Sequence, residues 1–252
     1  MKVVIWFSCG AASAVAAKLA VERYGNESCR VVNNPIAEED EDNQRFLVDV
    51  EKWIGITIEK AINPEYQSTS AVEVWNRRKF MSGIGGAPCT LELKRKARQH
   101  WESQNEFDFL VLGFTSEEKD RAERFQKTER RNLVPILIEE GFTKRDCFLA
   151  VSEAGLTLPR VYQMGYPNAN CIGCVKATSP TYWNLVRRNH PGVFAERAKQ
   201  SRELGVKLAR HKGSRIFLDE LPEDARGNSI KTMSTECGLF CEEYTGKAIN
   251  EQ

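Results

Sequence analysis

Val3-Val4-Ile5-Trp6-Phe7-Ser8-Cys9-Gly10-Ala11-Ala12-Ser13 is the stretch of sequence that decides the fold. Its first five residues are apolar, which is typical of a strand buried in a parallel sheet. A short Ser/Cys/Gly turn follows, and an Ala-rich helix is expected from about Ala11 to Tyr24. In this arrangement, small residues let backbone N–H groups approach a phosphate while the helix dipole favours the anion. The sequence therefore predicts a phosphate site formed by Ser8, Cys9, Gly10, Ala11, Ala12 and Ser13.

Further strands and helices alternate along the chain after this unit. Apolar runs predict strands near residues 29–33, 56–59 and 109–112, with one more edge element at 133–137. An amphipathic helix is expected before residue 55, and another is expected to begin at Thr143. This alternation predicts a three-layer, Rossmann-like α/β fold with a mostly parallel sheet and helices on both faces. We expect a nucleotide-binding domain over residues 1–180, and a helical, loop-rich extension over 181–252.

Charge and hydropathy limit the classes of function. The chain has 252 residues with 36 basic and 35 acidic side chains, so no global field favours nucleic acid or an acidic membrane. Any phosphate site must therefore be local. The apolar run at the start is shorter than the ~18 residues that a membrane span needs, so we expect a cytoplasmic protein with no membrane partner.

Cysteine usage points to metal binding or thiol chemistry. The chain has eight cysteines, and a disulfide framework is not expected in a cytosolic protein. Cys171 and Cys174 form a Cys-x-x-Cys pair, whereas Cys237 and Cys241 are four residues apart. Such a pair with two distant cysteines is a common way to assemble four thiolate ligands for zinc or an iron-sulfur cluster. Cys29 and Cys147 are expected to be small buried hydrophobic residues.

The first loop resembles a known nucleotide-binding motif. Ser-x-Gly-x-x-Ser at residues 8–13 is similar to the PP-loop, Ser-Gly-Gly-x-Asp-Ser, of the adenine nucleotide α-hydrolase superfamily. That superfamily includes PAPS and APS (sulfonucleotide) reductases and tRNA thiolases. Cys9 stands where the family has its first Gly, and Ala12 stands where it has Asp. The missing Asp argues against magnesium-assisted release of pyrophosphate from ATP, but it leaves phosphate binding intact.

A second segment extends the resemblance. Residues 113–121 are similar to the family's Gly-x-Arg-x-x-Glu-Ser-x-x-Arg segment, which lies over the bound nucleotide. The resemblance implies that this segment binds the nucleotide, with Arg121 as the anion partner, through Gly113, Thr115, Glu117 and Arg121. Thr115 replaces the family's first Arg. Asn33 and Asn34 follow the second strand, where open α/β sheets usually bind the adenosine part of a ligand.

The cysteine segments resemble those of sulfonucleotide reductases in particular. The run 155–166 before Cys171 and Cys174, the segment 88–94 and the segment 235–239 each match reductase motifs in order. The resemblance implies a 4Fe-4S cluster, with zinc as the alternative, on Cys89, Cys171, Cys174 and Cys241; Cys237 is the alternative fourth ligand. It also implies that Cys237 is the catalytic nucleophile and that a thioredoxin-like protein is the reductant. Phe240 replaces the His of the reductase motif.

Three hypotheses for function follow. The first is a PAPS reductase-like enzyme, of the oxidoreductase or sulfurtransferase class, that binds ATP, APS or PAPS and acts on sulfur through a cysteine thiol. The second is an ATP-dependent sulfurtransferase that thiolates a nucleic acid, held by basic residues at 77–79 and 94–98. The third is a non-catalytic nucleotide or iron-sulfur binding module.

Overall fold

The computed structural model describes residues 1–83 and 85–228. They divide into two compact units, each assembled from separate stretches of chain. Unit 1 comprises Met1–Pro35, Glu41–Ala61 and Gln99–Arg160, and unit 2 comprises Ile36–Asp40 together with the described residues of 62–98 and 161–228. The division at residue 180 that the sequence suggested stays a prediction.

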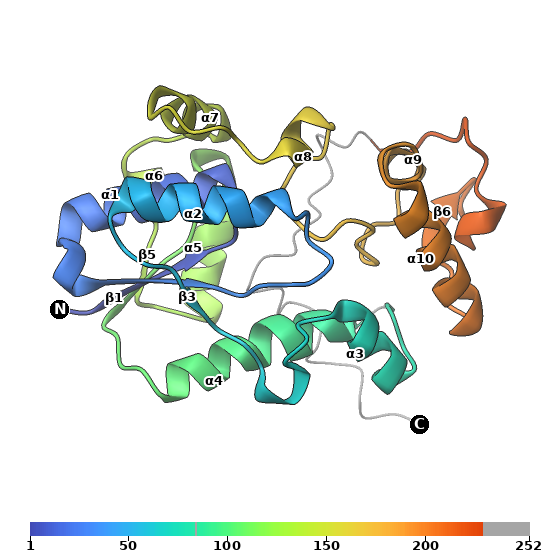
Figure 1. The fold of residues 1–252 in the computed structure, drawn as a ribbon, viewed down its shortest axis with the longest axis horizontal. Helices are drawn as coiled ribbons and strands as arrows, with labels where there is room; N and C mark the ends of the chain where they lie inside the picture. Colours follow the sequence, from blue (N-terminus) through green and yellow to red (C-terminus); the bar gives the residue numbers. More distant parts are fainter. Residues whose placement is uncertain (84, 229–252) are drawn as a thin grey trace. The chain divides into compact units, whose positions relative to one another are not determined.

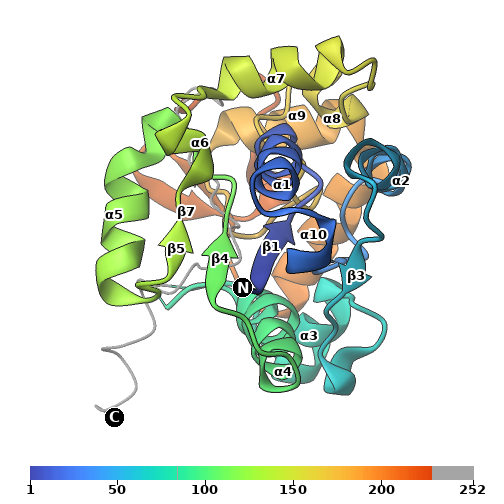
Figure 2. The same ribbon diagram turned by 90° about the vertical axis from the view of Figure 1, so that its left-hand side faces the viewer.

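Unit 1 is built on a parallel β-sheet of five strands (Figures 1 and 2). The strands are β1 (Val3–Phe7), β2 (Cys29–Asn33), β3 (Glu59–Lys60), β4 (Phe109–Val111) and β5 (Leu133–Val134). Their order across the sheet is β3-β2-β1-β4-β5, and every neighbouring pair is parallel. Val3 of β1 pairs with Cys29 on one side and with Phe109 on the other. The predicted Rossmann-like α/β class is therefore confirmed.

Helices cover both faces of this sheet, as Figure 2 shows. They are α1 (Ala11–Tyr24), α2 (Asp42–Ile54), α4 (Ala97–Ser103), α5 (Lys119–Thr128), α6 (Ile136–Glu139) and α7 (Lys144–Glu153), with short turns η1 (Asn26–Ser28) and η4 (Ser116–Glu118). Alternate residues of β1, such as Ile5 and Phe7, join one buried cluster with α1, α2 and α7. On the other face, the Trp6 ring meets Trp101 of α4 edge-on, with centroids 5.6 Å apart. The strand is buried on both faces because both carry helices.

Two strands differ from the sequence-based expectation. The third strand was expected over 56–59, but β3 begins at Glu59. The reason is local, since the backbone N–H of Ile58 donates to the Glu51 carboxylate at 2.7 Å rather than to a neighbouring strand. The edge element expected at 133–137 splits into β5 and α6, because Pro135 has no N–H with which to continue the ladder. The predicted cap at Thr143 is confirmed, since its hydroxyl accepts from the N–H of Asp146 at 3.2 Å.

Unit 2 is mostly helical. Its elements are η2 (Pro64–Tyr66), α3 (Ala71–Arg78), the π-helical segment η3 (Thr90–Lys96), α8 (Arg160–Gln163), α9 (Pro180–Asn189), α10 (Pro191–Glu203), β6 (Ala209–His211), β7 (Ser214–Ile216) and η5 (Leu218–Glu220). Its core includes the fully buried Val74, Met81 and Trp183. The extension after residue 180 was expected to be helical and loop-rich. Helices α9 and α10 are followed by the β6–β7 hairpin, whose turn is formed by Lys212 and Gly213, both with positive φ. No helix in the two described ranges is long and apolar enough to cross a membrane.

Candidate nucleotide and thiol sites

The loop after β1 occupies the position where open α/β sheets bind ligands. Strands β2 and β3 lie on one side of β1, and β4 and β5 lie on the other. The connections therefore diverge at the carboxyl ends of β1 and β4, which is the topological switch point of such sheets. Ser8, Cys9 and Gly10 follow β1 at this point, and α1 begins at Ala11.

Hydrogen bonds within the loop fix its shape. The Ser13 hydroxyl accepts from the backbone N–H of Ser8 at 3.1 Å and donates to the Gly10 carbonyl at 2.9 Å. Gly10 is the N-cap of α1, so the cap residue contributes no side-chain hydrogen bond to this helix end. Cys9 has a φ of 56°, a left-handed conformation in which glycine is favoured. The Gly that the PP-loop motif has at this position thus has a physical reason, and Cys9 adopts a conformation that is strained for a residue with a side chain.

Gly113, which follows β4, lies directly against this loop. A Cβ atom at Gly113 would come within 2.8 Å of the Ser13 backbone nitrogen and 3.0 Å of the Ala12 carbonyl carbon. Real side chains essentially never approach so closely. The structure therefore brings together the two predicted segments of the nucleotide site, the β1 loop and the start of the β4 loop, and the contact requires glycine.

Asn33 and Asn34 join neighbouring strands at the same edge of the sheet. The Asn33 side-chain amide donates to the Phe7 carbonyl at 2.8 Å and to the Cys9 sulfur at 3.6 Å. The Asn34 amide donates to the Ala61 carbonyl at 2.9 Å. The buried Oδ1 of Asn34 has no hydrogen-bond partner among the residues described. Asn33 is thus a structural link, while Asn34 retains an unused acceptor.

Thr115, Glu117 and Arg121 follow β4 as predicted. Thr115 and Glu118 form a reciprocal cap of η4. The guanidinium of Arg121 lies 5.0 Å from the centre of the Phe114 ring and donates to Glu118 at 2.6 Å. Burial disfavours the charged form of Glu117, but hydrogen bonds from Thr115 and from backbone N–H groups outweigh it, so the pKa of this carboxyl is lowered. The partner of Arg121 is the Glu118 carboxylate, so a bound phosphate would have to displace Glu118 in order to pair with Arg121.

The Cys-x-x-Cys pair lies on a tight turn in unit 2. Gly173, between the two cysteines, has a φ of 70°. The Tyr182 hydroxyl accepts from the Cys174 backbone N–H at 2.8 Å and lies 3.4 Å from the Cys171 carbonyl, to which it donates. The Ile172 N–H donates to the Glu38 carbonyl at 2.9 Å. Several parts of unit 2 thus hold the backbone of this turn.

The predicted metal ligands are only partly described. Cys174 belongs to the hydrophobic cluster of unit 2, and Cys89 and Cys171 pack against that cluster. Within residues 1–83 and 85–228, no group of three or more His, Cys, Asp or Glu side chains is arranged so that it could hold a metal ion. The predicted nucleophile Cys237 and the predicted fourth ligand Cys241 lie outside the described residues. Cys89, Cys171 and Cys174 all belong to unit 2, but they are not gathered into such a group. Thiolates suit a cluster or zinc by their chemistry, and the metal centre stays a prediction.

One buried carboxylate was not singled out from the sequence. Glu92, in the π-helical segment η3, has a side chain with no exposed surface. It is bound by Arg78 and, at 2.8 Å, by Lys96, while Asn63 donates to its backbone carbonyl at 3.0 Å. π-Helical turns are rare and often mark functional sites. The sequence feature that could have identified Glu92 is its position between two leucines in a segment otherwise rich in basic side chains.

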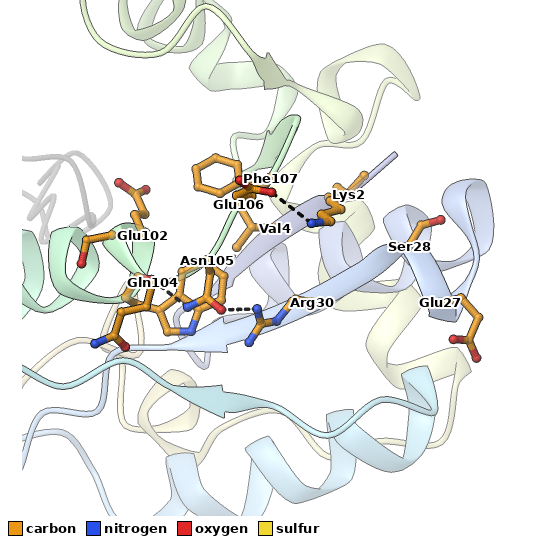
Figure 3. A pocket seen from close by; sticks show the side chains of 13 residues that line it. Lys2, Val4, Glu27, Ser28, Arg30, Glu102, Gln104, Asn105, Glu106 and Phe107 are labelled. Carbon is orange, nitrogen blue, oxygen red and sulfur yellow. Dashed lines mark hydrogen bonds and ion pairs between the residues drawn. The ribbon is translucent and has the colours of Figure 1, made fainter.

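A separate cavity lies at the opposite edge of the sheet in unit 1. It has a volume of about 620 Å³ and is lined by residues at the amino ends of β1 and β2 and by residues 101–107 (Figure 3). Its two basic side chains, Lys2 and Arg30, are paired within the protein. Arg30 donates to both oxygens of Glu59 at 2.6 Å, and Lys2 lies 3.4 Å from Glu106. None of the predicted site residues lines this cavity.

Comparisons with known proteins identify no family for the chain. No protein-family model matches it, and no curated protein matches it. Among solved structures, the chain is similar to the U34-tRNA thiolase NcsA from Methanococcus maripaludis, described with its 4Fe-4S cluster. The two share 15% identity and a TM-score of 0.45, over 81% of this chain and 72% of that chain. A similarity this weak assigns neither family nor activity, so the fold class rests on the parallel sheet itself.

Proposed function

We propose that this chain is an adenine-nucleotide-dependent enzyme of the PP-loop type that acts on sulfur. The carrying observation is the close packing of Gly113 against the Ser8–Ser13 loop at the switch point of the sheet. A loop of small residues, a helix N-terminus with glycine as its cap residue and a neighbouring glycine together suit a phosphate group. The ordered resemblance to sulfonucleotide reductases supports sulfur as the reacting element.

The residues of the predicted nucleotide site in unit 1 have different roles in this proposal. The backbone N–H groups at the start of α1 bind the phosphates, and the Ser13 hydroxyl keeps the loop in shape. Asn33 ends β2 and Asn34 follows it, at the place where open α/β sheets bind the adenosine part of a ligand. Arg121 leaves Glu118 and turns to a phosphate when the nucleotide binds. These contacts would position the nucleotide without the Asp that Ala12 replaces.

The thiols supply the sulfur chemistry. Cys89, Cys171 and Cys174, with Cys241 or Cys237, would hold a 4Fe-4S cluster or zinc. A bound cluster would supply electrons or an iron site for sulfur, whereas zinc would supply no redox chemistry. The turn at Cys171–Cys174 would orient two of the ligands through its bonds to Tyr182 and Glu38.

Two reactions fit this site. In the first, sulfur is transferred to a nucleic acid: ATP adenylates a base oxygen with loss of pyrophosphate, and sulfide then replaces that oxygen with loss of AMP. The observation in its favour is an exposed basic end of α3, where Arg77, Arg78 and Lys79 precede the exposed ring of Phe80. Basic side chains beside an aromatic ring suit a nucleic-acid backbone and an unstacked base.

The second reaction is reduction of a sulfonucleotide. The Cys237 thiolate attacks the sulfur of APS or PAPS, an S–S bond forms, and the bond from sulfur to the phosphate oxygen breaks. A thioredoxin-like dithiol then releases sulfite and is itself oxidised. This reading depends on the match at residues 235–239, which lie outside the described part of the chain.

A charge-matched pair of variants at Ser8 tests nucleotide binding. Ser8 is exposed, and Ser8→Asp and Ser8→Asn have nearly the same shape but differ by one negative charge. We expect Ser8→Asp to weaken binding of ATP, APS and PAPS about tenfold relative to Ser8→Asn, since the added charge repels phosphate (about 1.4 kcal/mol). Titration calorimetry measures the dissociation constants. Equal affinities in the two variants would show that the phosphates bind elsewhere.

Product analysis separates the two reactions. Anaerobically purified protein is incubated with ATP, a sulfide donor and RNA, or with PAPS or APS and a dithiol. Pyrophosphate together with thiolated bases supports transfer to nucleic acid, and sulfite supports reduction. Tight nucleotide binding with neither product would support the non-catalytic module instead.

A further inference from the structure

Arg197 is a buried cation that contacts the Cys-x-x-Cys turn. It belongs to α10, and only 2% of its surface is exposed. Its guanidinium lies 4.6 Å from the centre of the Trp75 ring, and its Nε donates to the Gly173 carbonyl at 3.4 Å. Its Nη1 donates to the Gln200 side-chain oxygen at 2.8 Å. All of these partners are electrically neutral.

No carboxylate forms an ion pair with Arg197 among the residues that the structure describes. Glu38 is the carboxylate whose charge acts on it most strongly. The Glu38 side chain, however, accepts from the Ser70 hydroxyl and from the N–H groups of Ala71 and Val72 at the start of α3. Burial lowers the pKa of Arg197, and the charges of Glu38 and then Cys171 oppose this shift. A buried charge without a partner is costly, so an anion is expected next to it.

The turn is held close to this guanidinium. A Cβ atom at Gly173 would come within 3.0 Å of Val193 Cγ1 and 3.3 Å of Arg197 Cγ. Gly173 therefore lets the turn approach α10, and Tyr182 fixes the backbone of the cysteine on either side. An anionic sulfur centre carried by the cysteines of this turn would therefore lie close to the Arg197 guanidinium and balance its charge.

We propose that Arg197 is a positioning residue that supplies the fixed positive charge for an anionic sulfur centre on Cys171 and Cys174. This inference rests on the proposed function, in which both cysteines are thiolate ligands of a 4Fe-4S cluster. A cluster held by four thiolates carries net negative charge, and charge and hydrogen bonding around it set its reduction potential. Arg197 therefore retains the cluster and favours its reduced, more negative state.

Three variants test the proposal. Arg197→Gln removes the charge, Arg197→Lys keeps it, and Gln200→Glu leaves Arg197 in place but neutralises it with a carboxylate of nearly the same shape as the amide. After anaerobic reconstitution with iron and sulfide, we expect Arg197→Gln and Gln200→Glu to lose iron to a chelator at least about tenfold faster than the unmodified chain. Their reduction potentials, measured by redox titration with EPR detection, should shift to more negative values. Arg197→Lys should stay close to the unmodified chain in both measurements.

Metal-free protein provides the control for packing. Without a cluster, Arg197→Gln should unfold at no lower urea concentration than the unmodified chain, because it removes an unpaired buried charge. Lower stability of metal-free Arg197→Gln and Arg197→Lys alike would show that Arg197 serves only packing, and would overturn the proposal. Equal iron retention and potential in Gln200→Glu and the unmodified chain would also overturn it, while leaving the cluster in place. An unmodified chain that takes up no iron would refute the cluster and the role of Arg197 together.

Discussion

The Ser8–Ser13 loop of unit 1 and the Cys171–Cys174 turn of unit 2 offer two different environments for an anion. The loop presents a helix N-terminus and small neutral residues, and its own hydroxyl and carbonyl groups hold it in shape. The turn is held by Tyr182 and contacts the buried Arg197. The first environment relies on backbone dipoles and the second on a full charge.

This difference teaches where each site is sensitive to mutation. A backbone site depends on close approach, so an added methyl group damages it while most side-chain changes do not. A site with a buried charge depends on its electrostatic partners, so a nearly isosteric change of charge damages it. Three predictions follow from the comparison, in order of decreasing expected effect.

The largest effect concerns the reactivity of Cys147 in unit 1. This cysteine has no proposed role as a metal ligand, unlike those of the turn beside Arg197. Burial raises the pKa of the Cys147 thiol from 9.0 to about 12. At pH 8 its thiolate fraction should therefore be lower by about a thousandfold than that of an unperturbed thiol. We expect iodoacetamide to leave Cys147 unmodified in the folded chain and to modify it in urea, as measured by mass spectrometry of the peptides.

The same shift predicts a dependence of stability on pH. The raised pKa belongs to the folded state, so the unfolded chain loses this proton first as the pH rises. The contribution of Cys147 to stability is thus fully present below pH 9 and is lost between pH 9 and about 12. Cys147→Ala should reduce this alkaline loss. Rapid alkylation of Cys147 in the folded chain at pH 8 would contradict both statements.

The second prediction concerns the buried charge at Glu92. Glu92→Gln keeps the shape of the side chain but leaves Arg78 and Lys96 without their shared carboxylate. We expect the free energy of unfolding to fall by about 1.5–3 kcal/mol, as for the loss of hydrogen bonds to a charged group. Urea denaturation measures the change. Glu196→Gln is a suitable control, because Glu196 is an exposed carboxylate of unit 2.

An unchanged midpoint for Glu92→Gln would mean that exposure of Arg78 and Lys96 to water already compensates them. Their side chains are 48% and 38% exposed, so an unchanged midpoint is the result that would contradict the prediction. In that case, of the two buried charges Glu92 and Arg197, Arg197 would be the one whose electrostatic partners determine its sensitivity to mutation.

The third prediction concerns the backbone site. Gly113→Ala adds a single methyl group 2.8 Å from the Ser13 nitrogen. Overpacking of this kind costs about 1–3 kcal/mol, and the lower entropy of the unfolded chain offsets about 0.4–1 kcal/mol of it. We expect a net loss of about 1–2 kcal/mol in thermal or urea unfolding, together with weaker nucleotide binding.

Gly192→Ala is the matched control, since nothing lies within 4 Å of its Cβ position and its φ is not positive. That variant should be neutral or slightly stabilising. If Gly113→Ala behaves like Gly192→Ala, the two loops are not in firm contact, and the main support for the nucleotide site is lost.

Sequence patterns predicted unit 1 well because its signals are local. The apolar run of β1 and the Ala-rich run of α1 each have one regular period, and both elements appear where they were expected. The cap at Thr143 is likewise decided by neighbouring residues. Cys29 and Cys147 are buried, as the absence of spaced partners suggested. The third strand was misplaced because the Glu51 carboxylate, seven residues away, binds the Ile58 N–H.

Unit 2 was harder to predict because its key contacts join distant residues. Arg197 lies in a charged helix and resembles many exposed arginines, and only the fold shows that it is buried against Trp75 and Gly173. Glu92 is similar, since its burial depends on α3 and on Asn63. The spacing of Cys171 and Cys174 indicated a pair of thiolate ligands, but it could not reveal the neighbouring cation.

The alternation of the chain between the units has a consequence for biosynthesis. The chain passes from one unit to the other at residues 35, 40, 61, 98 and 160. During translation, β1 cannot pair with its second neighbour, β4, until about 100 more residues have been synthesised. Such distant pairings slow folding. Neither unit can be excised as a continuous fragment, so truncation is a poor way to separate their activities. The first segment of each unit is made well before the last segment of that unit, which begins at residue 99 in unit 1 and at residue 161 in unit 2.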